Sequence, residues 1–142
     1  MQKKKLLIIC PYPIGESPSQ RFRFEQYFNV LEKKEAVVIT KPFYGLNTWQ
    51  ILYTNGHFIH KVIGIVVGFW GRLLLLSTVR KYDFIFIHRE ATPLGPPWFE
   101  WVAAKIFHKR IIYDFDDAIW LPNYSETNAR FHRLKAYWKV RY

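Results

Sequence analysis

Cysteine is nearly absent from this sequence, since Cys10 is the only one among 142 residues. A single cysteine excludes an internal disulfide and a CxxC metal site, and it fits a reducing compartment. The glycine patterns GxGxxG and GxxxxGK are also absent, so nothing supports a dinucleotide site or a P-loop. Acidic residues are few, with 11 Asp and Glu against 21 Lys and Arg. The net charge of +10 predicts a negatively charged neighbour, such as nucleic acid, a membrane surface or a phosphorylated substrate.

Apolar and aromatic residues, by contrast, make up 50% and 19% of the chain and predict a globular protein. The length suits one domain with a core, and we expect residues 1–142 to form a single Rossmann-like domain that is cut off before its end. The lysines at positions 3–5 and the apolar run 6–10 superficially resemble a signal peptide. Because Pro11 and Pro13 end this run, it is instead predicted to be the first buried strand of a cytoplasmic protein.

Short β-branched and aromatic runs alternate with segments of helical period. This alternation predicts an α/β fold, a Rossmann-like parallel sheet flanked by helices. The predicted strands are residues 5–10, 36–40, 82–88 and 111–115. The predicted helices are residues 19–35, 58–79 and 97–107 and a last one from Ser125. In the first of them, Phe22, Tyr27 and Val30 recur at helical spacing and Ser19 is the predicted cap. Residues 43–57 show no clean period, and they are predicted only to be aromatic and rich in loops.

Three carboxylates, Asp114, Asp116 and Asp117, follow the last predicted strand. Like charges this close repel one another, so the cluster needs a cation, hydrogen-bond donors or a ligand. One interpretation is structural: one Asp caps the next helix, another pairs with an arginine and the third is solvated. The other is functional, because ligands of parallel α/β sheets sit outside the carboxyl ends of the strands.

Cations far apart in the sequence are expected at the same edge of the sheet. Arg21 and Arg23 fall in the first turn of a predicted helix, where they oppose the helix dipole unless an anion binds, although two ordinary surface arginines would look the same. His88 ends the third predicted strand, and Arg89 and Glu90 follow it directly. A lone histidine is more often structural, but this position favours a role in binding. The predicted crevice therefore suits a nucleotide or a sugar phosphate.

Residues 58–79 are the most apolar part of the chain and come close to the minimum length of a transmembrane helix. Arg72 lies within them, which would cost roughly 2.5–3.5 kcal/mol in a bilayer. Lys61, Gly64, Gly68 and Arg72 share one stripe, while nearly all other positions are apolar. The pattern predicts a helix that is largely buried, or one pressed against a sheet on one side and dipping into a lipid interface on the other.

Taken together, these segments resemble the N-terminal half of family 4 retaining glycosyltransferases of the GT-B fold. The resemblance rests on the Pro-Tyr-Pro-Ile-Gly loop, on Ser-Gln-Arg-Phe-Arg at 19–23, on Tyr82–Glu90 and on Tyr-Asp-Phe-Asp-Asp-Ala-Ile-Trp at 113–120, and it covers nearly the whole chain. It implies a two-domain enzyme whose active site lies between two Rossmann-like halves. The N-terminal half would receive the acceptor, and a C-terminal half, not included in this sequence, would hold most of the nucleotide-sugar donor.

The resemblance also implies residue roles. Asp116 and Asp117 stand where many relatives carry a histidine, and they are the expected catalytic positions, contacting sugar hydroxyls or holding Arg21 or Arg23. The expected substrate-binding residues are Gly15 beside the donor diphosphate, Arg21, Arg23, His88, Arg89, Glu90 and Asp114. No metal and no cofactor apart from the nucleotide-diphosphate sugar substrate are implied. The resemblance implies hexosyl transfer and no activity from this chain alone. The apolar helix and the positive charge, by contrast, are the reasons to expect an envelope or lipid-linked acceptor and an anionic membrane surface as a further partner.

Two other functions stay open. Residues 111–116 are similar to the DxD strand of haloacid-dehalogenase-type phosphatases, in which the first Asp is the nucleophile and the second the acid or base. Ala118 stands where those enzymes have Thr, and few residues follow for their later catalytic strands. The charge and the aromatics also suit a basic module that binds membrane surfaces or nucleic acid. No RNA-binding aromatic motif is present, so nucleic acid is not an expected partner.

Overall fold

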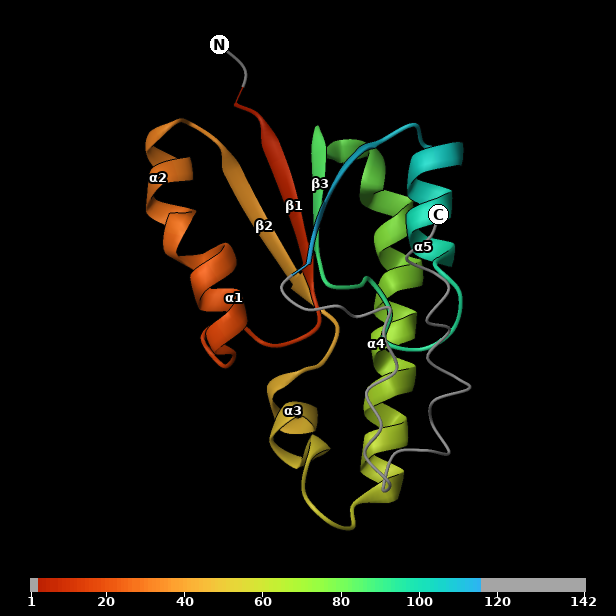
Figure 1. Ribbon diagram of the computed structural model, residues 1–142. Helices are drawn as coiled ribbons and strands as arrows, with labels where there is room; N and C mark the ends of the chain where they lie inside the picture. The colour runs from red at the N-terminus through yellow and green to blue at the C-terminus, as the bar shows by residue number, and fades with distance from the viewer. Residues whose placement is uncertain (1–2, 116–142) are drawn as a thin grey trace.

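The computed structural model describes residues 3–115, and its centre is a four-stranded sheet (Figure 1). All pairs are parallel and the strand order is β2-β1-β3-β4. The strands are β1 (Lys5–Cys10), β2 (Val37–Pro42), β3 (Phe84–His88) and β4 (Arg110–Asp114). The predicted α/β class with a Rossmann-like parallel sheet is confirmed. Asp116, Asp117 and the helix expected from Ser125 lie outside the described residues.

The interior strand β1 is apolar from Leu6 onward because it is covered on both faces. Leu7 and Ile9 contribute to one core cluster, and Ile8 and Cys10 to another on the opposite face. All four residues are at most 1% exposed. Strands covered on both faces are continuous apolar runs, without the alternation of half-buried strands, and this is the pattern seen here.

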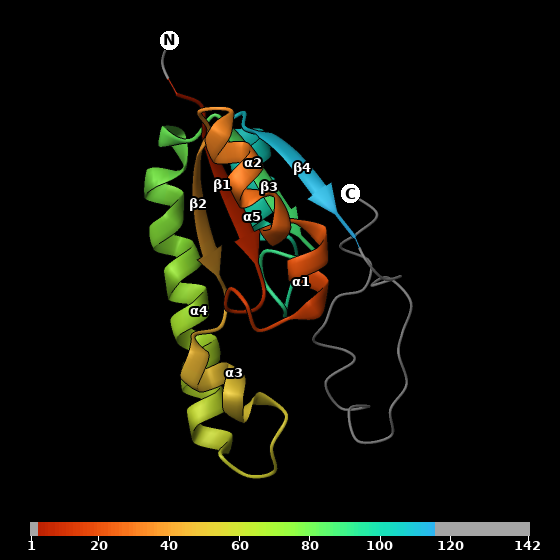
Figure 2. The same cartoon turned by 90° about the vertical axis from the view of Figure 1, so that its left-hand side faces the viewer.

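Helices cover both faces of the sheet, with α1 and α2 on one side and α4 and α5 on the other (Figures 1 and 2). The α-helices are α1 (Pro18–Arg23), α2 (Phe28–Lys33), α3 (Leu46–Leu52), α4 (Phe58–Thr78) and α5 (Trp98–Trp101). Three short helical turns extend them: η1 (Glu25–Tyr27), η2 (Val79–Lys81) and the π-helical η3 (Val102–Ile106). The first helical layer packs Phe24 on the sheet, and the second packs Val79 and Phe99.

The prediction of one continuous helix over 19–35 is wrong, because the segment breaks at Phe24. This residue leaves helical geometry, with φ −142° and ψ −32°, and its ring packs 5.9 Å from that of Phe86 and 5.5 Å from that of His88. The break resets the phase of the helix. Phe22 and Tyr27, which suggested the helical period, are therefore 71% and 51% exposed.

The segment 43–57, predicted only to be aromatic and rich in loops, also contains the helix α3. This helix has only seven residues, too few to display a period that could be recognised in the sequence. Its Trp49 ring lies 4.4 Å from the ring of Tyr12 and 5.5 Å from that of Tyr53. The helix thus adds an aromatic cluster beside the loop that leaves β1.

The predicted helix over 58–79 is confirmed as α4, but the prediction that it would be largely buried is wrong. The inward face consists of Gly64, Gly68, Arg72 and Leu75, and most of the apolar side chains point outward. A Cβ on Gly64 would lie 2.3 Å from the Thr48 side chain. Small residues allow the helix backbone to approach its neighbours closely, and this is why the glycine stripe faces inward.

Candidate functional site

The switch in strand order puts a candidate site beside the carboxyl ends of β1 and β3. From β1 the chain goes to α1 on one face of the sheet, whereas from β3 it goes to α5 on the other (Figure 1). Neighbouring strands whose connections leave to opposite faces open a crevice beyond their carboxyl ends, where ligands of this architecture bind. Here that place, called the crevice below, lies beside the loop after β1 and His88–Glu90.

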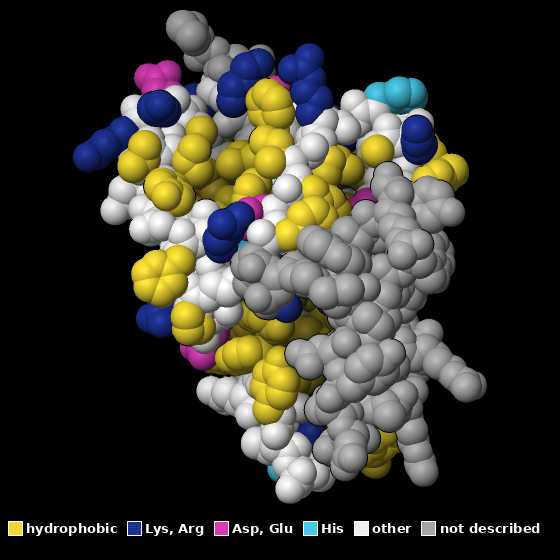
Figure 3. Space-filling view, viewed as in Figure 1, with side chains coloured by type: hydrophobic (Ala, Val, Ile, Leu, Met, Phe, Trp, Pro, Cys, Tyr) yellow, Lys and Arg dark blue, Asp and Glu magenta, His cyan; other side chains and the backbone are white. Residues whose placement is uncertain are grey.

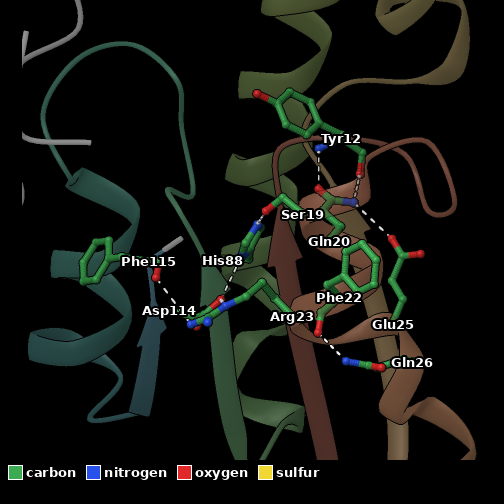
Figure 4. Close-up of polar contacts among 10 residues, drawn as sticks. All are labelled: Tyr12, Ser19, Gln20, Phe22, Arg23, Glu25, Gln26, His88, Asp114 and Phe115. Atoms are coloured by element: carbon green, nitrogen blue, oxygen red, sulfur yellow. Dashed lines mark hydrogen bonds and ion pairs between the residues drawn. The ribbon is translucent and has the colours of Figure 1, made fainter. Parts of the chain in front are cut away.

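Three distant segments meet at His88 (Figure 4). The imidazole is fully buried, and its Nδ1 lies 2.8 Å from Asp114 Oδ2 while its Nε2 lies 3.1 Å from Ser19 Oγ. An ionised carboxylate only accepts hydrogen bonds, so Nδ1 carries the proton and donates it to Asp114. In the neutral imidazole Nε2 then accepts a hydrogen bond from the Ser19 hydroxyl. The series Ser19, His88 and Asp114 is therefore held in one orientation.

Arg23 approaches the same carboxylate from α1. Its Nε donates to Asp114 Oδ2 at 3.1 Å, and its Nη2 pairs with Oδ1 and donates to the Phe115 carbonyl at 3.3 Å. Burial tends to raise the pKa of Asp114, but the hydrogen bonds and charges of Arg23 and His88 outweigh it, so the pKa lies below its usual value. The structural interpretation of the acidic cluster expected one Asp to pair with an arginine, and the structure shows this pairing for Asp114.

The prediction that Arg21 and Arg23 lie in the first turn of a helix capped by Ser19 is wrong. The helix begins at Pro18, its N-cap is Ser17 without a side-chain hydrogen bond, and both arginines lie in its last turn. Proline is favoured at a helix start, which explains the earlier beginning. The two arginines therefore do not lie at a helix N-terminus, and anion binding by them stays a prediction. The Arg21 side chain is exposed and makes no hydrogen bond or ion pair within residues 3–115.

Gln20 fixes the loop that follows β1. This side chain is fully buried, accepts from the Tyr12 N–H at 3.0 Å, and donates to the Tyr12 carbonyl at 3.0 Å and the Pro13 carbonyl at 3.4 Å. Gly15, with φ +84°, donates its N–H to Glu25 Oε2 at 3.0 Å. A carboxylate thus already binds the amide that the family resemblance assigns to a donor diphosphate, and this role of Gly15 stays a prediction.

Arg89 and Glu90 follow His88 at the rim of the crevice and are partly buried. Arg89 adopts φ +65°, which is uncommon for a residue with a side chain, and its N–H donates to the Asp114 carbonyl at 2.8 Å. Residues other than glycine with positive φ values occur more often at functional sites than elsewhere. Both charges act on the hydroxyl of the partly buried Tyr12. Burial and Tyr53 raise the pKa of this hydroxyl; Glu90 raises it further, whereas Arg89 lowers it. The aromatic cluster of α3 and these charged residues are therefore neighbours.

Arg72 lies beneath the crevice, and its role there was not predicted. It is 2% exposed, donates through Nε to the Ala91 carbonyl at 2.8 Å and through Nη2 to the Cys10 carbonyl at 3.3 Å. Burial lowers its pKa to about 10, although Cys10 and the nearby Glu100 act to raise it. Arg72 thus ties the end of β1 to the loop after β3. A single arginine inside an apolar helix was the signal that could have located it.

Among residues 3–115, no group of three or more His, Cys, Asp or Glu side chains is arranged to hold a metal ion. The residues brought together are Arg23, His88 and Asp114, with Arg89 and Glu90 at the rim. Comparisons with protein-family models, with curated proteins and with solved structures find no match to this chain, so its candidate function is argued from the geometry of this crevice.

Proposed function

We propose that this chain is the N-terminal, acceptor-side domain of a retaining GT-B glycosyltransferase that transfers a hexosyl group from a nucleotide sugar. The observation that carries the proposal is the convergence of Arg23, His88 and Asp114 at the switch point between β1 and β3. A position of this kind is where α/β sheets bind nucleotides and sugar phosphates. The family resemblance of the sequence leads to the same function.

The chemistry of the crevice fits such a substrate. The Arg23 guanidinium has five N–H donors, and a phosphate oxygen would compete with the Asp114 carboxylate for them. The rings of Tyr12 and Trp49 offer an apolar surface on which a sugar ring can lie. Ser19 is only partly buried, and beside the hydrogen bond that it donates to His88 its hydroxyl oxygen can accept one from a sugar hydroxyl. Catalytic roles for Asp116 and Asp117 remain predictions.

A phosphatase of the haloacid-dehalogenase type agrees less well with the site. Its first aspartate would be Asp114, which must present a free oxygen to the phosphorus atom. Here Oδ2 accepts hydrogen bonds from Arg23 and His88, and Oδ1 pairs with Arg23. Both oxygens of the would-be nucleophile are therefore engaged.

Nuclear magnetic resonance titration of the ¹⁵N-labelled chain with a panel of nucleotide-diphosphate sugars tests the proposal. We expect saturable shifts in the backbone amides of residues 12, 14–17 and 88–90, with weak affinity because this domain would supply only part of the donor site. Arg23→Ala should abolish these shifts. The matched control is Arg80→Ala, which removes an exposed arginine at the opposite edge of the sheet. Shifts confined to the basic cavity of about 350 Å³ at that edge, or equal binding by both variants, would contradict the proposal.

A second candidate is a hydrolase with Ser19 as its nucleophile, since Ser19, His88 and Asp114 show the hydrogen-bond order of a catalytic triad. Against it, Ser19 lies within α1 and not on the sharp strand-to-helix turn of a GxSxG motif. Labelling with a fluorophosphonate distinguishes the two functions. Covalent labelling that Ser19→Ala removes would favour the hydrolase, whereas the glycosyltransferase proposal predicts no labelling.

A further inference from the structure

The outward face of α4 carries an apolar surface that no described element covers. In Figure 2 the helix runs along one margin of the molecule, and no other ribbon is drawn beyond it. Eight side chains form this surface, here named the α4 stripe: Ile59, Val62, Ile63, Val66, Val67, Trp70, Leu73 and Leu74. They are 41–70% exposed, and their spacing of three and four residues puts them on one side of the helix.

Charge is absent from the α4 stripe along the whole helix. The two cations of α4 point elsewhere, since Lys61 Nζ donates to the Thr54 carbonyl and Arg72 is buried beneath the crevice. With 21 residues, α4 is about 30 Å long. Helices on the surface of soluble domains present polar residues on their outer side, and a continuous exposed apolar surface marks an interaction site.

Basic residues gather where the α4 stripe ends. Arg80 and Lys81 follow the helix directly in η2. They line a cavity together with further basic side chains: Lys4, His108, Lys109 and Arg110. Asp83 is the only acidic residue among those lining it. Figure 3 shows Lys and Arg side chains clustered at this end of the molecule, near the N-terminus. The stripe therefore ends in positive charge.

We propose that the α4 stripe docks on an anionic lipid bilayer, with α4 lying in the plane of the membrane. The apolar side chains would enter the boundary between headgroups and acyl chains, with Trp70 at that depth, and Arg80 and Lys81 would bind lipid phosphates. The net charge favours a lipid surface over a second copy of the chain as the binding partner. Pairing two stripes would bring together two proteins that each carry a net charge of +10. This inference does not depend on the proposed sugar transfer.

The helix is held at the surface and does not cross the membrane. By length and composition alone, Phe58–Lys81 could span a bilayer. However, Gly64 and Gly68 pack directly on Thr48 and Phe43, and Arg72 donates to one carbonyl at the end of β1 and to another in the loop after β3. Spanning would detach this face from the domain and leave the Arg72 charge without its partners. Docking by the opposite face leaves all these contacts in place.

Vesicle flotation with the full chain tests the proposal. Vesicles of phosphatidylcholine with and without phosphatidylglycerol are the probes, and we expect binding that requires the anionic lipid. The variant V66Q/W70Q/L73Q should bind about 100-fold more weakly, because three apolar side chains no longer enter the lipid. All three side chains are at least half exposed, so circular dichroism and thermal unfolding should show a folded protein.

Matched variants isolate the surface. F22Q/W101Q/I106Q changes three side chains of similar exposure outside α4 and should bind like the wild type. R80Q/K81Q should lose about 30-fold in affinity for anionic vesicles, whereas K33Q/K34Q, which removes the same charge elsewhere, should lose much less.

Fluorescence quenching by lipids brominated along their acyl chains reports on depth. Quenching at shallow bromine positions that disappears in Trp70→Phe would support docking in the plane of the membrane. Three results would overturn the proposal. One is an absence of wild-type flotation, and another is equal binding by the stripe variant. The third is dimerisation that depends on the α4 stripe without vesicle binding, which would assign the face to a second copy of the chain.

Discussion

Two glycines three residues apart in α4 should respond to alanine in opposite ways. A Cβ on Gly68 would lie 2.6 Å from the Phe43 ring and 2.8 Å from the Phe43 carbonyl oxygen, whereas a Cβ on Gly71 would have no atom within 4 Å. Alanine is favoured over glycine inside a helix by roughly 1 kcal/mol. Gly71→Ala should therefore increase the free energy of unfolding by up to about that amount.

Gly68→Ala gains the same helix propensity but creates a clash. The Phe43 ring cannot move aside easily, because it is packed against the rings of Tyr44 at 4.9 Å and Phe69 at 5.4 Å. Overpacking in a tight interior costs about 1–3 kcal/mol. The free energies of unfolding of the two variants should therefore differ by about this cost, with Gly68→Ala the less stable.

Urea unfolding followed by far-ultraviolet circular dichroism measures both variants under the same conditions. Equal stability of Gly68→Ala and Gly71→Ala, within about 0.5 kcal/mol, would refute the close approach of α4 to the loop after β2. The close packing of these glycines is what turns the apolar side of α4 outward. Equal stability would therefore also remove the basis of the membrane proposal.

Further predictions concern the crevice and the core beside it. The pKa of Asp114 lies below its ordinary value of 3.8, so its ion pair stabilises the fold above that pH and is lost as the pH falls through the folded-state pKa. Asp114→Asn should be less stable than the wild type by about 1.5–3 kcal/mol at pH 7, and urea midpoints at pH 7 and pH 3 should show the difference shrinking in acid. Gln20→Ala should lose about 2–4 kcal/mol of stability in urea, because it leaves the buried Tyr12 amide and carbonyl without partners, and a loss below about 1 kcal/mol would contradict this. Burial raises the pKa of the Cys10 thiol to about 12, so a colorimetric disulfide reagent should react only at the rate of unfolding, and rapid reaction of the native protein would contradict the structure.

The sequence by itself determined the class of fold. The apolar runs that became β1 and β3 are continuous, as strands covered on both faces require, and they alternate with helical segments. Parallel strands gather their carboxyl ends at one edge, which is why His88 and Asp114 could be assigned to the same crevice from the sequence. The existence of α4 was equally predictable, because its apolar composition extends over 21 residues.

Only the tertiary structure decided which groups touch and which faces are buried. Ser19 and His88 are 69 residues apart, and Arg23 and Asp114 are 91 apart, so no local pattern encodes their contacts. The break at Phe24 arises because its ring packs on β3, a long-range interaction that outweighs helix propensity. From the sequence alone, the glycine side of α4 could have faced either the domain or the solvent. Which of the two holds depends on the residues that pack against it, and these are known only from the structure.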